Sequence, residues 1–227
     1  MSQVILITGA SKGLGAALAE DFTRLGHRVY TCARSPVEAA FSALSSHHTL
    51  LDVCNRQAIQ EWVATIVQQE GELNVVINNA GIMNEPAPLW ELSPENFDLV
   101  VDVNIKGVFN IVQATVPVML SRGSGLIINL ISGSGRKNPA RSGAYNLSKT
   151  AIESFTKTLA NELPEGIGAV ALIPGTTNTA MLQKILGEQA HEFPDVADWV
   201  ARATPFILSL DYTQSGQILT VPGQQAM

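Results

Sequence analysis

The sequence has few charged residues, few aromatic residues and only two cysteines. Charged residues make up 15% of the 227 residues and aromatic ones 6%, against 46% that are hydrophobic. A chain so poor in charge and so rich in apolar residues can bury a large core, which excludes an intrinsically disordered protein. Cys32 and Cys54 are too few for a disulfide framework, so we expect free thiols in a reducing, cytoplasmic compartment.

Long apolar runs and clusters of basic residues are also missing. No apolar run reaches the roughly 18 residues of a membrane span, and Val4–Ile7 is too short for the core of a signal peptide. The formal net charge of −6 makes the chain a poor match for nucleic acid or an anionic membrane. His47 and His48 are adjacent in a polar segment without evident further ligands, so we predict no metal site.

Short apolar segments alternate with longer helix-like segments along the sequence. Most of the short segments are apolar throughout, which is typical of parallel strands covered on both faces. We predict strands at Val4–Ile7, Arg28–Ala33, Thr49–Leu51, Val75–Ile77, Leu126–Ile131, Ala169–Ile173 and Ile218–Val221. We predict helices at Ala16–Leu25, Arg56–Gln69, Glu95–Leu120, Tyr145–Leu163 and Val196–Leu210. This order predicts one α/β domain over residues 1–227, with about seven strands in a doubly wound parallel sheet.

The stretch from Thr176 to Phe193 has the least regular pattern. Gly187 and Pro194 interrupt weak helical signals there. We interpret residues 176–193 as a short substrate lid within the same domain.

A glycine-rich turn follows the first predicted strand. The run Thr8-Gly9-Ala10-Ser11-Lys12-Gly13-Leu14-Gly15 places its glycines at the spacing GxxxGxG. Glycine lets a backbone turn sharply and approach a pyrophosphate closely. The following helix then offers free N–H groups and a partial positive charge to that anion. With a strand before it and a helix after it, the turn predicts a nucleotide site; tight helix–strand packing alone is the alternative.

Further motifs follow the glycine-rich turn in a definite order. They are Asn78-Asn79-Ala80-Gly81, then Asn104, Ser132, the YxxxK pair of Tyr145 and Lys149, and Pro174-Gly175 followed by Thr179. Ser132 precedes Tyr145 by thirteen residues. This series, from Val4 to Gly223, resembles the short-chain dehydrogenase/reductase family. The resemblance implies a Rossmann-type fold and an enzyme that transfers a hydride between a nicotinamide cofactor and a carbonyl or alcohol.

Tyr145 and Lys149 lie four residues apart at the start of a predicted helix, so they share one face. A phenol can protonate the alkoxide that forms when a ketone accepts a hydride, but its ordinary pKa of about 10 is too high for the reverse role near neutrality. An ammonium about 4 Å away would favour the phenolate by about 4 kcal/mol at an effective dielectric of about 20. We therefore predict that Lys149 lowers the pKa of Tyr145.

The resemblance implies roles for other residues of the site. Ser132 would hold and polarise the carbonyl oxygen, Asn104 would fix a water that links Lys149 to solvent, and Lys149 would also bind the nicotinamide ribose. Taken alone, Ser132 could cap a turn and Asn104 could belong to a buried polar network. The predicted catalytic residues are Asn104, Ser132, Tyr145 and Lys149. The expected substrate pocket consists of the lid and Ile82, Met83, Asn84, Gly133 and Ser134.

The second predicted strand ends in Ala33-Arg34, where family members that prefer NAD usually have an Asp. Lys12 and Arg34 would attract a 2′-phosphate that an acid would repel, so we predict NADP(H) as the cofactor. Plain surface charge is the alternative. Asp52 and Val53 resemble the pair that holds the adenine. The predicted cofactor-binding residues are Gly9, Ser11, Lys12, Gly13, Leu14, Gly15, Arg34, Asp52, Val53, Asn79, Ala80, Gly81, Tyr145, Lys149, Pro174, Gly175 and Thr179.

The motifs together predict an NADP(H)-dependent oxidoreductase, such as a carbonyl reductase, with Tyr145 as general acid and base. One alternative is a non-catalytic dinucleotide sensor or scaffold on the same fold, but such proteins commonly lose the Tyr or the Lys, and this chain has both. Another is an isomerase or dehydratase that uses bound nucleotide. Arg136, Lys137 and Arg141 could favour an acidic substrate, although a solvated loop is the favoured interpretation. Apolar residues on several faces of two predicted helices favour a homo-oligomer, with buried helices in a monomer as the alternative, and the resemblance implies a homodimer or homotetramer.

Overall fold

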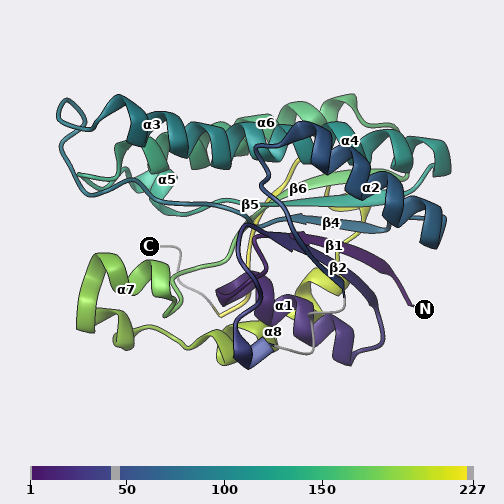
Figure 1. Cartoon of the computed structure of the whole chain (residues 1–227), viewed down its shortest axis with the longest axis horizontal. Helices are drawn as coiled ribbons and strands as arrows, with labels where there is room; N and C mark the ends of the chain where they lie inside the picture. The colour runs from purple at the N-terminus through teal and green to yellow at the C-terminus, as the bar shows by residue number, and fades with distance from the viewer. Residues whose placement is uncertain (1, 42–46, 224–227) are drawn as a thin grey trace.

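One sheet of seven parallel strands runs through the middle of the protein, in the order β3-β2-β1-β4-β5-β6-β7 (Figure 1). Its strands are β1 (Val4–Thr8), β2 (Arg28–Ala33), β3 (His48–Leu50), β4 (Val75–Asn78), β5 (Gly125–Leu130), β6 (Ile167–Ile173) and β7 (Ile218–Thr220). The structure is a computed structural model that describes residues 2–41 and 47–223; residues 1, 42–46 and 224–227 of the predicted domain lie outside this description. The order and the parallel pairing confirm the predicted doubly wound α/β fold.

The central strands are largely apolar because helices cover both faces of the sheet. Every residue of β1 is buried. Within it, Val4 and Leu6 belong to one hydrophobic cluster, and Ile5 and Ile7 to the cluster on the opposite face. Successive side chains of a strand point to opposite faces, so a strand between two helical layers needs an apolar residue at every position. The predicted strand bounds lie within two residues of the observed ones.

Helices α2, α4 and α6 lie over one face of the sheet, and α1 and α8 over the other (Figure 1). The helices are α1 (Gly13–Arg24), α2 (Arg56–Glu70), α3 (Pro94–Val101), α4 (Gly107–Arg122), α5 (Ser134–Lys137), α6 (Gly143–Glu162), α7 (Ala180–Leu186) and α8 (Val196–Leu208). Short 3-10 helices occur at η3 (Gly187–Glu192) and η4 (Tyr212–Gln214). The predicted lid therefore contains α7 and η3, and Gly187 lies at the junction between them.

The helix predicted at Glu95–Leu120 is interrupted. A π-helical turn, η2 (Asp102–Lys106), separates α3 from α4. The apolar periodicity of the sequence does not distinguish such a turn from an α-helical one, so the prediction of one regular helix was wrong here. The whole stretch Pro94–Arg122 is long and apolar enough to cross a membrane, but half of its most apolar window is buried inside the protein. It packs on α2 and α6 and is a core helix of the domain.

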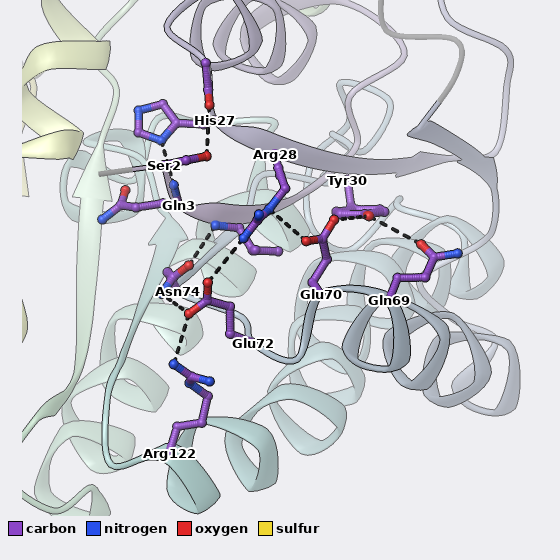
Figure 2. Close-up of polar contacts among 12 residues, drawn as sticks. Ser2, Gln3, His27, Arg28, Tyr30, Gln69, Glu70, Glu72, Asn74 and Arg122 are labelled. Carbon is purple, nitrogen blue, oxygen red and sulfur yellow. Dashed lines mark hydrogen bonds and ion pairs between the residues drawn. The ribbon is translucent and has the colours of Figure 1, made fainter.

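Polar side chains join the elements at the edge of the sheet where the strands begin (Figure 2). Glu72 accepts hydrogen bonds from Arg28 at 3.2 Å and from Arg122 at 3.0 Å. Asn74 Oδ1 accepts a bond of 2.7 Å from the Val4 N–H. These contacts connect the starts of β1 and β2 with the end of α4, on the side opposite to the carboxyl ends of the strands, where ligands bind in open α/β sheets.

Trp199 in α8 anchors the loop that follows β6. Its side chain is fully buried, and Nε1 donates a hydrogen bond of 2.8 Å to the carbonyl of Pro174. The buried ring therefore connects the core beneath α8 to the turn at Pro174 and Gly175.

We expect Trp199→Phe to lower the free energy of unfolding by about 1–3 kcal/mol, because it leaves a small cavity and a carbonyl without its donor. Urea denaturation followed by circular dichroism measures the loss. Trp90→Phe is the matched control, since Trp90 is 86% exposed, and it should change the stability by less than about 0.5 kcal/mol. Equal losses in the two variants would contradict an anchoring role for Trp199.

Candidate functional site

A cleft of about 690 Å³ lies at the carboxyl ends of the strands. Loops after β1, β2, β4, β5 and β6 line it, so segments distant in sequence meet at this edge of the sheet. The predicted cofactor-binding residues that line it are Gly9, Ser11, Lys12, Gly13, Leu14, Arg34, Asp52, Val53, Asn79, Ala80, Gly81, Tyr145, Lys149, Pro174 and Thr179. Gly15 and Gly175 are the two members of the predicted set that do not line the cleft.

The glycine-rich turn is packed against Asn79. Asn79 Nδ2 donates to the carbonyls of Thr8 at 2.8 Å and of Gly9 at 3.0 Å. Gly9 has φ +68°, and a Cβ there would lie 2.6 Å from the Cα of Ala80. A Cβ on Gly15 would collide with the Asn79 side chain. Gly15 thus serves the close packing of the turn, whereas Gly13 and Leu14 present the first turn of α1 to the cleft.

Charged and polar side chains gather around Lys12 at one end of the cleft. Lys12 Nζ lies 3.9 Å from the Glu38 carboxylate, and both side chains are more than half exposed. The Ser35 hydroxyl donates to the Ser11 hydroxyl at 3.1 Å. Ser35 and Glu38 both line the cleft and were missed in the sequence, although Ser35 directly follows Arg34. Glu38 partly offsets the positive charge that Lys12 brings to this end.

His48 lies near this end without a role as a metal ligand. Its ring nitrogens lie 2.8 Å from the Thr31 hydroxyl and 3.0 Å from the Ser35 carbonyl. Within residues 2–41 and 47–223 no group of His, Cys, Asp or Glu side chains is arranged to hold a metal ion.

Lys149 is almost completely buried at the middle of the cleft. Its Nζ donates a hydrogen bond of 2.8 Å to the carbonyl of Leu130, at the end of β5. The same nitrogen lies 5.7 Å from the centre of the Tyr145 ring. Burial lowers the pKa of Lys149 to about 8, because removal from water disfavours the ammonium. The spacing of the YxxxK motif therefore brings the two side chains together as predicted.

Burial also acts on Tyr145, in the opposite direction. Desolvation raises the pKa of its phenol, and a hydrogen bond with Ser132 opposes this rise. The prediction that Lys149 holds this pKa low is wrong for the structure described here. The same burial that disfavours the phenolate also disfavours the Lys149 ammonium that would stabilise it, so the neutral phenol is the favoured form.

Ser132 lies beside the phenol but does not line the cleft. Its Oγ is 2.8 Å from the Ser134 Oγ and accepts a bond of 3.2 Å from the Ser134 N–H. The turn-capping interpretation of Ser132 thus describes these contacts, and its predicted role in polarising a carbonyl oxygen stays a prediction.

Asn104 lies in the π-helical turn and is 1% exposed. Its Oδ1 accepts a bond of 2.8 Å from the Ile82 N–H, and its Nδ2 donates to the Ile82 carbonyl at 2.8 Å and to the Ser148 hydroxyl at 2.9 Å. A Cβ on Gly81 would lie 3.4 Å from Asn104 Oδ1 and 3.5 Å from Lys149 Nζ, so these two groups flank Gly81. The buried-network interpretation describes Asn104, and its predicted link to water stays a prediction.

The substrate end of the cleft differs from the expectation. Of Ile82, Met83, Asn84, Gly133 and Ser134, only Ile82 lines it. The predicted lid contributes Asn178, Thr179, Ala180 and Met181. Arg136, Lys137 and Arg141 do not line the cleft, and Arg136 pairs with Glu153 at 3.2 Å. The idea of an acidic substrate therefore has no support in this geometry.

Taken together, the cleft fits a nicotinamide dinucleotide. A glycine-rich turn at a helix N-terminus suits a pyrophosphate. Asp52 and Lys149 lie where they can bind hydroxyl or amine groups on either side of it, and Lys12 and Arg34 supply cations at one end. The phenol of Tyr145 marks the other end, where a proton can be transferred.

Comparisons with known proteins agree with this geometry. The family model described as short chain dehydrogenase matches residues 3–190. The chain is 41% identical over 226 residues to an NADPH-dependent pterin aldehyde reductase of Arabidopsis thaliana, covering 97% of this chain and 93% of that protein.

Solved structures show the same architecture. A short chain dehydrogenase of Shigella flexneri in complex with NADP has a TM-score of 0.86 at 26% identity, with 96% of each chain covered. A 3-ketoacyl-(acyl-carrier-protein) reductase of Brucella melitensis in complex with NADH has a TM-score of 0.84 at 25% identity, covering 99% of this chain and 98% of that one. The similar structures thus include complexes with both dinucleotides.

Proposed function

The chain belongs to the short-chain dehydrogenase/reductase family, and on that premise we propose that it is an NADP(H)-dependent carbonyl reductase. The observation that carries the proposal is the pairing of Tyr145 with the buried Lys149 inside a cleft that also contains the glycine-rich turn. A sensor or scaffold would need the turn but not a proton donor at the other end of the cleft.

The side chains of the site suit proton transfer to a carbonyl oxygen. A nicotinamide cofactor supplies the hydride when it is bound. Tyr145 holds the proton on its phenol oxygen, and its raised pKa keeps that proton in place near neutral pH. Lys149, fixed by the Leu130 carbonyl, places its ammonium beside the ring. The Ser132 hydroxyl orients the phenol. The direction of the reaction would follow the supply of NADPH, so we propose that the protein works as a reductase.

The proposed substrate is an aldehyde or ketone that carries no charge next to its carbonyl group. The charged side chains that line the cleft are Lys12, Arg34, Glu38, Asp52 and Lys149, and the lid residues that line it, Asn178, Thr179, Ala180 and Met181, are all uncharged. The relative from Arabidopsis thaliana is a pterin aldehyde reductase by name, so a pterin aldehyde is the first compound to test. Loss of NADPH absorbance with a panel of carbonyl compounds distinguishes a reductase from a sensor or an isomerase, which would consume no NADPH.

Tyr145→Phe should lower kcat about a hundredfold or more while NADPH binding stays within about twofold, because only the transferable proton is removed. Stopped-flow fluorescence measures binding and NADPH absorbance measures turnover. Tyr212→Phe is the control, since Tyr212 is 40% exposed and lies in η4, outside the cleft. Turnover of Tyr145→Phe near that of the control would sink the proposal.

The preference for NADP(H) is proposed from Lys12 and Arg34, and the name of the Arabidopsis relative supports it. The double variant with Ala33→Asp and Arg34→Ala should reduce the ratio of kcat/KM with NADPH to that with NADH by about 10- to 100-fold, the scale of a hydrogen bond to a charged group. Arg136→Ala, outside the cleft, is the control. If the wild-type protein used NADH as well as NADPH, the proposed preference would be wrong.

We also propose that two copies associate through α4 and α6. An apolar groove of about 310 Å³ runs between these helices, and its lining includes Phe109, Val112, Val116, Pro117, Phe155 and Leu159. Phe109 is 46% exposed although it is large and apolar. Sedimentation equilibrium should give a dimer or tetramer, and Phe109→Lys should shift it toward the monomer. A wild-type protein that is monomeric at micromolar concentrations would contradict this assembly.

A further inference from the structure

We propose that Asn84 is a positioning residue for Tyr145. It caps the first turn of α6, the helix that carries the phenol, from the loop that follows β4. The inference rests on the proposed role of Tyr145 in proton transfer, but it concerns a contact of the backbone and can be tested without any substrate.

The start of α6 lacks the cap that its own sequence would supply. Tyr145 is the third residue of the helix, and the N–H groups of a first turn have no partners within a helix. A serine just before a helix normally accepts a bond from one of them. Ser142 holds that place but makes no such bond. Instead, Asn84 Oδ1 accepts a bond of 3.1 Å from the Tyr145 N–H, across 61 residues of sequence.

The same side chain also holds the segment that leads into the helix. Asn84 is 5% exposed, and its Nδ2 donates to the carbonyls of Glu85 at 2.9 Å and of Arg141 at 3.1 Å. Arg141 has φ +67°, a conformation that residues with a Cβ rarely adopt. The Ala87 N–H donates a second hydrogen bond, of 3.3 Å, to the Arg141 carbonyl. A strained backbone conformation persists where several contacts from its surroundings hold it, and here the loop of Asn84 supplies two hydrogen bonds to Arg141.

The loop also packs on the first residue of α6. A Cβ on Gly143 would lie 2.6 Å from Leu89 Cδ1, so the glycine allows the leucine to cover the helix start. The loop from Asn84 to Leu89 therefore contacts the residues on either side of the helix start by hydrogen bonds and by packing. Because Tyr145 is only two residues further along, the position of its ring depends on this contact.

Such a contact matters for turnover more than for binding. A proton donor must lie within hydrogen-bond reach of the reacting oxygen, and a shift of about 1 Å can lower a rate by about a hundredfold. Asn79, Ala80, Gly81 and Ile82 of the same loop also line the cleft, but the glycine-rich turn and the segments after β2, β3 and β6 that line it come from other parts of the chain. Loss of the Asn84 cap should therefore lower kcat and leave the affinity for NADPH nearly unchanged.

The test compares Asn84→Ala with Asn84→Asp in the full-length protein. Alanine removes all three bonds, whereas aspartate keeps an oxygen that can accept from the Tyr145 N–H and loses the donors to Glu85 and Arg141. Amide hydrogen exchange read by mass spectrometry should show exchange at Tyr145 at least about tenfold faster in Asn84→Ala and close to wild type in Asn84→Asp. Turnover should fall about tenfold or more in Asn84→Ala and stay within about threefold in Asn84→Asp.

Asn74→Ala is the matched control. Asn74 also accepts a backbone N–H bond through Oδ1, from Val4, but at the opposite edge of the sheet (Figure 2). Its loss should lower the melting temperature and leave both kcat and the exchange at Tyr145 unchanged. A general loss of stability would affect this control as much as Asn84→Ala.

Each outcome decides the question. Unchanged exchange at Tyr145 in a folded Asn84→Ala protein, or turnover equal to that of Asn74→Ala, would overturn the positioning role. If Asn84→Ala does not fold, Asn84→Asp decides alone. Turnover near that of the wild type supports the cap. A loss of turnover greater than tenfold overturns it, because turnover would then depend on the Nδ2 bonds to Glu85 and Arg141 and not on the cap. If the wild-type protein consumes no NADPH but exchange at Tyr145 responds as expected, the proposed function fails and the cap stands.

Discussion

The hydrogen bond between the Lys149 ammonium and the Leu130 carbonyl is the contact on which the site depends. It joins α6 to the end of β5 and places a cation in a region from which water is nearly absent. A pKa lowered to about 8 corresponds to a cost of about 3 kcal/mol for the charged form. A fold that buries a cation at such a cost gains no stability from the charge itself, and the hydrogen bond to the Leu130 carbonyl offsets part of that cost.

The surroundings of Lys149 are built to hold this arrangement. Asn104 connects the loop of Ile82 with α6 through Ser148, and Gly81 lies between Asn104 and Lys149. Asn84 holds the first turn of the same helix. Helix α6 is therefore attached to the loop after β4 at two points, the Tyr145 N–H and, by way of Asn104, the Ser148 hydroxyl. A site that transfers protons requires this stiffness, because the distances it needs are short.

The sheet explains why these residues meet. Parallel strands present all their carboxyl ends at one edge, and β1, β3, β4, β5 and β6 are each followed by a loop that leads to a helix. The glycine-rich turn, the loop of Asn79 and the loop after β6 therefore converge, although they lie far apart in the sequence. At the opposite edge, the salt bridges of Glu72 join the start of β2 to the end of α4.

The apolar strand segments predicted the parallel sheet and its covering helices, the glycine spacing predicted the turn at the start of α1, and the YxxxK spacing predicted the proximity of Tyr145 to Lys149, whereas the other residues predicted to line the cleft came from the resemblance to the family. These features are local: they depend on side-chain periodicity and on the geometry of one helical turn. Only the tertiary structure decided four other features. They are the direction in which the pKa of Tyr145 shifts, the hydrogen bond from the Tyr145 N–H to Asn84, the position of Ser132 outside the lining of the cleft, and the π-helical turn at Asn104. Each of them depends on how deeply a group is buried and on which distant backbone atoms face it, and no pattern within a short stretch of sequence contains that information.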